Sequence, residues 1–149
     1  MVLYSIQFLQ NYFKHFSFDF LFTDQGFPVR YKIPNIGLLY LFELPFLLLG
    51  ILVLLKDSKK EGIFLLGWMV LAPLGSALTF DEIPNFQRTL LIFPASTIIT
   101  GIGLIRLFSQ MRAKSYWMTV LLGGIAVYSL FFFIHQYYVH GPWYRPWYI

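Results

Sequence analysis

The sequence predicts an all-α integral membrane protein with about four transmembrane helices and an N-terminal amphipathic helix at the membrane interface. Of the 149 residues, 58% are hydrophobic and 12% are charged, whereas a soluble domain carries about 25% charged residues. The charges gather in a few short stretches and leave long apolar runs between them. A bilayer imposes this pattern, because an ionised side chain at mid-membrane costs at least about 2.5–3.5 kcal/mol.

The first domain, residues 1–35, is expected to lie at the membrane surface. Residues 2–16 predict a helix that is too polar to span the bilayer. Its apolar positions share one side at helical spacing: Val2, Ile6, Leu9, Phe13 and Phe16. Residues 17–35 combine aromatic residues with glycine and proline, which predicts an ordered outer juxtamembrane loop.

The second domain, residues 36–135, is expected to be a four-span membrane module. Twenty helical residues at 1.5 Å each give about 30 Å, the thickness of the hydrocarbon core. Four apolar runs have about this length, and they cover residues 36–55, 62–80, 89–108 and 116–135. Pro73 is expected to kink the second span. Residues 136–149 form an aromatic tail, which is expected at the interface.

The positions of lysine and arginine predict the orientation. Five of these residues lie in the connections after the first and third spans: Lys56, Lys59, Lys60, Arg112 and Lys114. Short basic loops stay in the cytoplasm. The N-terminus, residues 79–88 and the C-terminus are therefore expected outside the cell (plasma) membrane, although Lys14, Arg30 and Lys32 would then lie outside as well.

Several other classes of function are not predicted. The net charge is +4, but the basic residues flank apolar runs instead of forming one stripe, so nucleic-acid binding is not expected. The chain has no cysteine, which excludes disulfides and thiolate metal ligands. His135 and His140 lack supporting carboxylates, so no metal site is expected, and no cofactor is expected either.

Residues 79–88 are the first candidate for a polar site. Their polar and charged side chains include Asp81, Glu82, Asn85, Gln87 and Arg88. Arg88 suits an anionic head group, because a guanidinium binds phosphate oxygens bidentately. It also stands beside the start of the third span, where helix N-terminal amides favour negative charge. The alternative is a solvated loop with Arg88 at the level of the lipid head groups.

Two further groups are candidates. Glu43 lies within the first span, and an intramembrane carboxylate usually faces a bundle interior or a wet cavity. The alternative is a protonated or hydrogen-bonded glutamate that packs against another helix. Arg30, Tyr31 and Lys32 form a cationic group just before that span. This group would either hold a phosphate or anchor the chain at the interface.

The third predicted span carries a face of small residues. They are Ala95, Ser96, Thr97, Thr100, Gly101 and Gly103. Small residues let two helix backbones approach closely in a membrane, so this face is expected to pack against another helix.

Residues 16–108 carry two loose motifs, G-x-x-Y-x-x-E-x-P and P-x-x-x-R, each next to a predicted span. Their residues are Gly37, Tyr40, Glu43 and Pro45 in the first, Pro84 and Arg88 in the second, with Pro94 early in the next span. In these features the chain resembles the later part of polytopic glycosyltransferases of the GT-C superfamily. That superfamily includes the protein mannosyltransferase and aminoarabinose transferase-like (family 39-like) enzymes.

The resemblance implies transfer of a sugar from a polyprenyl-phosphate carrier on the outer face of the membrane, with Arg88 contacting the carrier phosphate. Such enzymes take their catalytic base from a first outer loop near the N-terminus, which has no counterpart here. We therefore expect a fragment or a reduced paralogue that is inactive alone and works with the missing N-terminal half or a partner subunit. A histidine often precedes the loop arginine in the family, whereas Gln87 stands there in this chain.

Two other functions are compatible with the same residues. A non-enzymatic multi-pass membrane subunit or assembly protein would use Glu43, Pro73 and the small-residue face for packing. A small transporter or channel would need more than the two charged groups within the spans, Glu43 and Arg106.

Overall fold

A computed structural model describes residues 2–79, 81–110 and 115–141, together with their side chains except those of Val2, Arg30 and Ser115. This part of the chain is helical and contains no named strand, only two isolated β-bridges. The prediction of an all-α fold is therefore confirmed. The basic residues Arg112 and Lys114 and most of the aromatic tail, residues 142–149, lie outside the described residues.

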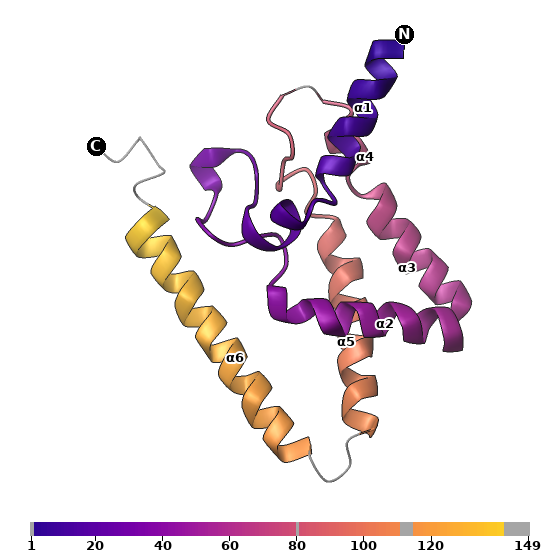
Figure 1. The fold of residues 1–149 in the computed structure, drawn as a ribbon, viewed down its shortest axis with the longest axis vertical. Helices are drawn as coiled ribbons and strands as arrows, with labels where there is room; N and C mark the ends of the chain where they lie inside the picture. The colour runs from indigo at the N-terminus through magenta and orange to yellow at the C-terminus, as the bar shows by residue number, and fades with distance from the viewer. Residues whose placement is uncertain (1, 80, 111–114, 142–149) are drawn as a thin grey trace.

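Helix α1 (Val2–Lys14) confirms the predicted N-terminal helix, and it presents its apolar side outward. The Phe13 side chain is 64% exposed, and Ile6 and Leu9 are exposed as well, whereas Asn11 and His15 are buried. His15 contacts Ser76 of α4 (Leu74–Ala77), beside which α1 lies in Figure 1. This part of the chain thus buries polar groups and leaves Ile6, Leu9 and Phe13 of the apolar face exposed, whereas Phe16, just beyond the helix, packs against the core.

The two middle helices are shorter than the predicted spans. Helix α2 (Leu44–Asp57) follows a 3-10 turn, and α3 (Lys59–Leu71) is separated from α4 by Pro73. Their 14 and 13 residues rise about 21 and 20 Å, less than the hydrocarbon core. Four transmembrane helices are therefore not confirmed.

Backbone hydrogen bonding explains why both helices are shorter than predicted. The residues before α2 bond to another segment and not within a helix: the amides of Leu38 and Leu39 donate to the carbonyls of Phe20 and Leu21 (3.2 and 2.6 Å). Pro45 then stands in the first turn of α2, where a missing N–H does no harm. Pro73 has no N–H with which to continue α3.

Helices α5 (Ile92–Gln110) and α6 (Ser115–His135) match the third and fourth predicted spans. A π-helical turn continues the second of them to His140. Both are long and apolar enough to cross a membrane, over residues 92–110 and 116–140. The described chain therefore contains two candidate membrane-spanning helices.

The core forms where α2 crosses α5 (Figure 1), and glycines make that crossing possible. A Cβ atom on Gly103 would lie 2.0 Å from the Phe46 carbonyl oxygen, and one on Gly50 would lie 1.9 Å from the Ile99 carbonyl oxygen. The small-residue face of α5 divides accordingly. Ala95, Ser96 and Gly103 are buried, whereas Thr97, Thr100 and Gly101 turn toward α6.

Candidate functional site

The site is built around the segment that connects α4 to α5, here called the arginine loop (residues 81–91). Asn85 is buried and organises it: its Oδ1 accepts a hydrogen bond from the Arg88 amide (3.1 Å). Its carbonyl accepts another from the Thr89 hydroxyl (2.7 Å), and Thr89 is fully buried. These bonds fix the backbone that presents Arg88 and displace the start of the helix from the predicted Thr89 to Ile92.

The Arg88 side chain is exposed but held in place. Its Nη1 donates to the Thr79 hydroxyl (2.7 Å) and to the Asp81 carbonyl (3.2 Å). Within the described residues, its Nη2 and Nε form no hydrogen bond, so one edge of the fork is anchored and the other is open. Asp81 therefore joins the site through its backbone instead of its carboxylate.

An apolar groove, here called the α3 groove, begins beside Arg88 and has a volume of about 630 Å³. Its other lining residues are apolar or glycine: Ile63, Phe64, Gly67, Trp68, Leu71, Ala72, Gly75 and Leu91. Those from α3 form one stripe that rises about 12 Å along the helix. Arg88 is the charged residue of this lining, so a cation stands at one end of an apolar channel.

The juxtamembrane segment (residues 24–33) is fastened to the arginine loop. The Phe27 amide donates to the Pro84 carbonyl (2.8 Å), and the Phe86 amide donates to the Phe27 carbonyl (3.0 Å). Gly26 allows this close contact, because its φ is +68° and a Cβ there would lie 2.3 Å from the Pro84 oxygen. Segments far apart in the sequence thus support one site.

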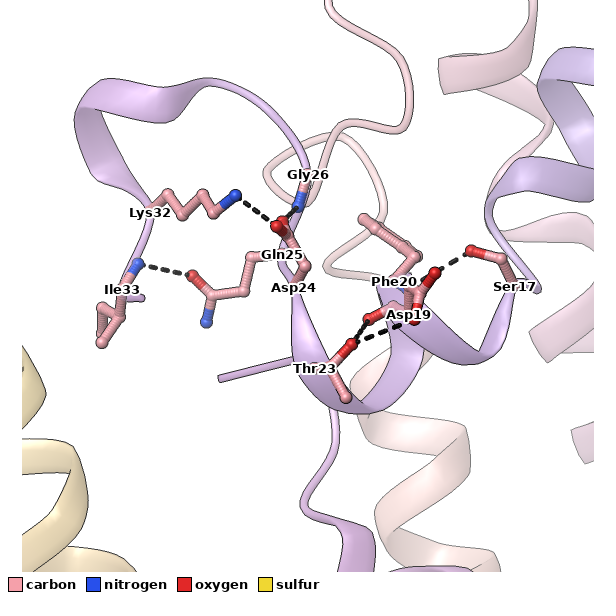
Figure 2. A network of polar contacts seen from close by, with 9 residues as sticks. All are labelled: Ser17, Asp19, Phe20, Thr23, Asp24, Gln25, Gly26, Lys32 and Ile33. Carbon is pink, nitrogen blue, oxygen red and sulfur yellow. Dashed lines mark hydrogen bonds and ion pairs between the residues drawn. The ribbon is translucent and has the colours of Figure 1, made fainter. Parts of the chain in front are cut away.

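A polar network holds the rest of the juxtamembrane segment, as Figure 2 shows. Asp24 forms an ion pair with Lys32 and accepts a hydrogen bond from the Gly26 amide (2.7 Å). Gln25 Oε1 accepts another from the Ile33 amide (3.2 Å). The Lys32 ammonium is therefore engaged by a carboxylate, and within the described residues it does not contact Arg88.

The other predicted site residues are dispersed. The Arg30 side chain lies outside the described part, and Tyr31 is exposed on a 3-10 turn (Val29–Tyr31). Glu82 adopts a φ of +53°, a region that non-glycine residues rarely occupy. Glu43 precedes α2 and lines a separate cavity between α5 and α6. Arg88 and the Asp81 backbone are thus the predicted residues that the structure brings together.

His15 is the residue that the sequence analysis missed. It is fully buried, and its Nδ1 lies 2.8 Å from the Asn11 carbonyl while its Nε2 lies 2.8 Å from Ser76 Oγ. A carbonyl only accepts, so Nδ1 carries the proton and Nε2 accepts from the Ser76 hydroxyl. The Asn85 amide also points at Nε2, at 3.4 Å. One buried ring therefore ties α1 and α4 to the arginine loop.

Burial of His15 lowers its pKa below the ordinary value of 6.5, so the ring is neutral at neutral pH. Ser76 is also fully buried. The pair therefore supports the loop and does not present a nucleophile to a ligand. The sequence gives only a weak indication of this role for His15: Asn11 and His15 are four residues apart on the polar side of the first helix.

Comparison with known proteins gives no relative for this chain: no family model, no curated protein and no solved structure matches it. Among the described residues, no group of three or more His, Asp or Glu side chains is arranged to hold a metal ion.

Proposed function

We propose that this chain is the membrane-embedded, carrier-binding part of a glycosyltransferase that uses a polyprenyl-phosphate-linked sugar on the outer face of the membrane. The observation that carries the proposal is Arg88, anchored by Thr79 and Asp81 at the end of the α3 groove. A polyprenyl phosphate has the matching shape, since a long apolar chain ends in an anionic head.

The open edge of Arg88 provides the chemistry for the head group. A guanidinium stays charged at any physiological pH, and its fork matches two phosphate oxygens. Because Thr79 already fixes Nη1, little side-chain freedom is lost when the phosphate binds. The chain itself binds and positions the carrier in this proposal. The catalytic carboxylate would come from another part of the same enzyme or from a partner subunit.

The pattern of burial supports a membrane location. Polar residues such as His15, Ser76 and Ser96 are fully buried, whereas Phe13 and Phe131 are 64% and 66% exposed. In water such an exposed apolar surface would favour aggregation, whereas lipid is a suitable solvent for it. Two apolar helices of sufficient length, α5 and α6, agree with this location.

Four spans remain part of the proposal. The 3-10 turn and α2 together give 17 helical residues (Leu41–Asp57), and Lys59–Ala77 gives 19 with the break at Pro73 included. Both lengths are within the range of about 17–25 residues for a spanning helix. In Figure 1, α1 and the end of α6 lie toward one end of the molecule and the start of α6 toward the other, which supports placing α1 and the end of α6 on the same side of the membrane.

The proposal is tested by binding of polyprenyl phosphate to the purified chain in detergent, with unphosphorylated polyprenol as the comparison. Removing a charge-assisted contact costs about 1.5–3 kcal/mol, so Arg88→Ala should weaken phosphate binding about tenfold or more. Arg106→Ala is the matched control, because Arg106 is an exposed arginine 4.0 Å from Asp57. Equal affinities of Arg88→Ala and the parent chain would refute the proposed role.

One observation favours the second candidate, a non-enzymatic membrane subunit. The cavity between α5 and α6 is open to the surface, which is compatible with occupation by another protein. The two functions are compatible, because a carrier-binding subunit also needs a partner that supplies the catalytic group.

A further inference from the structure

His15 is a buried titratable group that joins the N-terminal helix to the arginine loop. Its Nε2 lies 2.8 Å from Ser76 Oγ and 3.4 Å from the Asn85 amide nitrogen. Because Nδ1 donates to the Asn11 carbonyl, Nε2 is the nitrogen without a proton, and it accepts both hydrogen bonds. None of His15, Ser76 and Asn85 is more than 2% exposed, so bulk water cannot replace these bonds.

Asn85 connects this contact to Arg88. Its side-chain Oδ1 accepts a hydrogen bond from the Arg88 amide (3.1 Å), and its carbonyl accepts one from the Thr89 hydroxyl (2.7 Å). Asn85 is therefore held at its amide by His15 and in turn holds the two residues that follow in the arginine loop. Movement of Asn85 would move the backbone from which Arg88 reaches Thr79.

Protonation of Nε2 reverses the role of His15 in this network. An imidazolium carries a proton on both ring nitrogens and accepts no hydrogen bond. The Ser76 hydroxyl can rotate and accept from the new N–H, because a hydroxyl is both a donor and an acceptor. The Asn85 amide only donates, so two donors would face each other across the present distance of 3.4 Å. A buried donor left without an acceptor is costly, so the arginine loop should move away from the charged ring.

The charges around His15 do not compensate for a positive ring. Helix α4 has no titratable residue, and within the described residues no carboxylate forms an ion pair with His15. No nearby titratable side chain of the other surrounding segments forms a hydrogen bond or an ion pair with the ring. They are Tyr12 and Lys14 of α1, Asp19 of the π-helical turn Asp19–Thr23, and Asp81, Glu82 and Arg88 of the arginine loop. Burial accordingly lowers the pKa of His15 below its ordinary value of 6.5, so the ring becomes charged only in acidic solution.

We propose that His15 is a positioning residue whose protonation state controls the arginine loop. The neutral ring holds the loop in the conformation in which Arg88 binds an anionic head group, and the protonated ring releases the loop and weakens binding. The identity of the ligand rests on the proposed function, whereas the movement of the loop does not require a ligand. Carrier binding should therefore depend on the pH at the outer face of the membrane.

Binding of farnesyl methyl phosphate to the purified chain in detergent tests this control between about pH 4.5 and 8. The probe is a phosphodiester, so its single negative charge stays constant over this range. Because only the chain with a neutral ring binds, the affinity should fall about tenfold at one pH unit below the midpoint. The midpoint itself should lie below pH 6.5.

Three variants identify the titrating group. His15→Gln should remove the pH dependence, because an amide side chain does not titrate. His135→Gln, which changes an exposed histidine at the end of α6, should retain it. Ser76→Ala keeps the ring but removes a donor that stabilises its neutral form, so the midpoint should move to higher pH. This third variant tests the proposal even if His15→Gln does not fold.

A distance measurement without ligand separates this inference from the proposed function. Spin labels at Gln87→Cys and Ser58→Cys, which are exposed positions on the arginine loop and between α2 and α3, report the position of the loop. At temperatures below the unfolding transition, the distance between the labels should change with the same midpoint as binding and should stay constant in His15→Gln.

The outcomes of the two measurements are distinct. A pH-dependent distance in a chain that never binds the probe would refute the carrier site and support the control by His15. A constant distance, a measurable affinity that is constant over the pH range, or a pH dependence that persists in His15→Gln would each overturn the proposal. A midpoint that moves to lower pH in Ser76→Ala would overturn it as well.

Discussion

Two glycines let the backbones of α2 and α5 approach closely where these helices cross, and Gly103→Ala perturbs this crossing with a single methyl group. The added Cβ would lie 2.0 Å from the Phe46 carbonyl oxygen and 2.7 Å from the Gly50 amide nitrogen. Both are backbone atoms, so no side chain can rotate away. Reaching the ordinary contact distance of 3.4 Å from 2.0 Å requires the helices to separate by about 1.4 Å.

That separation should destabilise the protein. Overpacking a filled interface costs about 1–3 kcal/mol, and alanine returns about 1 kcal/mol through its better helix propensity. The net loss should be about 0–2 kcal/mol, with the upper part of this range expected because the obstructing atoms are backbone. Gly101→Ala is the control: it gains the same propensity, and its Cβ meets nothing within 4 Å.

Thermal unfolding in detergent, followed by tryptophan fluorescence, compares the two variants. Gly103→Ala should melt below the parent protein, and Gly101→Ala should melt at the same temperature or above it. The reasoning would be refuted if both variants melted together, because the tight crossing would then have no energetic consequence.

Two more predictions concern the pH dependence of stability and the orientation in the membrane. Because burial lowers the pKa of His15 below 6.5, the unfolded chain binds more protons than the folded one as the pH falls, so stability should decline below about pH 6.5. Melting temperatures between about pH 5 and 8 test this, and His15→Gln should lose that part of the decline, whereas parallel curves would contradict it. The proposed orientation is tested in the cysteine-free chain with Gln87→Cys and Ser58→Cys. An impermeant maleimide added to intact cells should label Gln87→Cys alone. Labelling of Ser58→Cys instead would show that the topology is the opposite of the one proposed.

The sequence was sufficient to predict those elements in which one property, hydrophobicity or polarity, dominates. Long apolar runs with at most one charge favour helices, because a helix satisfies its own backbone hydrogen bonds, and α5 and α6 have nearly the predicted boundaries. The polar content of residues 79–88 likewise marked the loop that carries Arg88. What the sequence could not show was that Thr79 and the Asp81 backbone would hold its side chain.

Non-local contacts explain the rest of the differences. Residues 36–40 are as apolar as a spanning helix, but the amides of Leu38 and Leu39 donate to the carbonyls of Phe20 and Leu21. These hydrogen bonds compete with helix formation. They depend on the segment around Phe20 and Leu21, which hydrophobic periodicity does not identify as a partner. Lys32 was grouped with its sequence neighbours as a cationic site, whereas its partner is Asp24. His15 was overlooked for the same reason, because Ser76 lies 61 residues away.

The most direct measurement of the central claim is photo-crosslinking with a polyprenyl phosphate that carries a photoreactive group in its apolar chain. Mass spectrometry of the crosslinked peptides should place the adducts on α3, at the groove residues Phe64 and Trp68. Arg88→Ala should greatly reduce these adducts, and Arg106→Ala should not. Adducts confined to α6, or adducts on α3 that are unchanged in Arg88→Ala, would contradict a carrier site at the α3 groove.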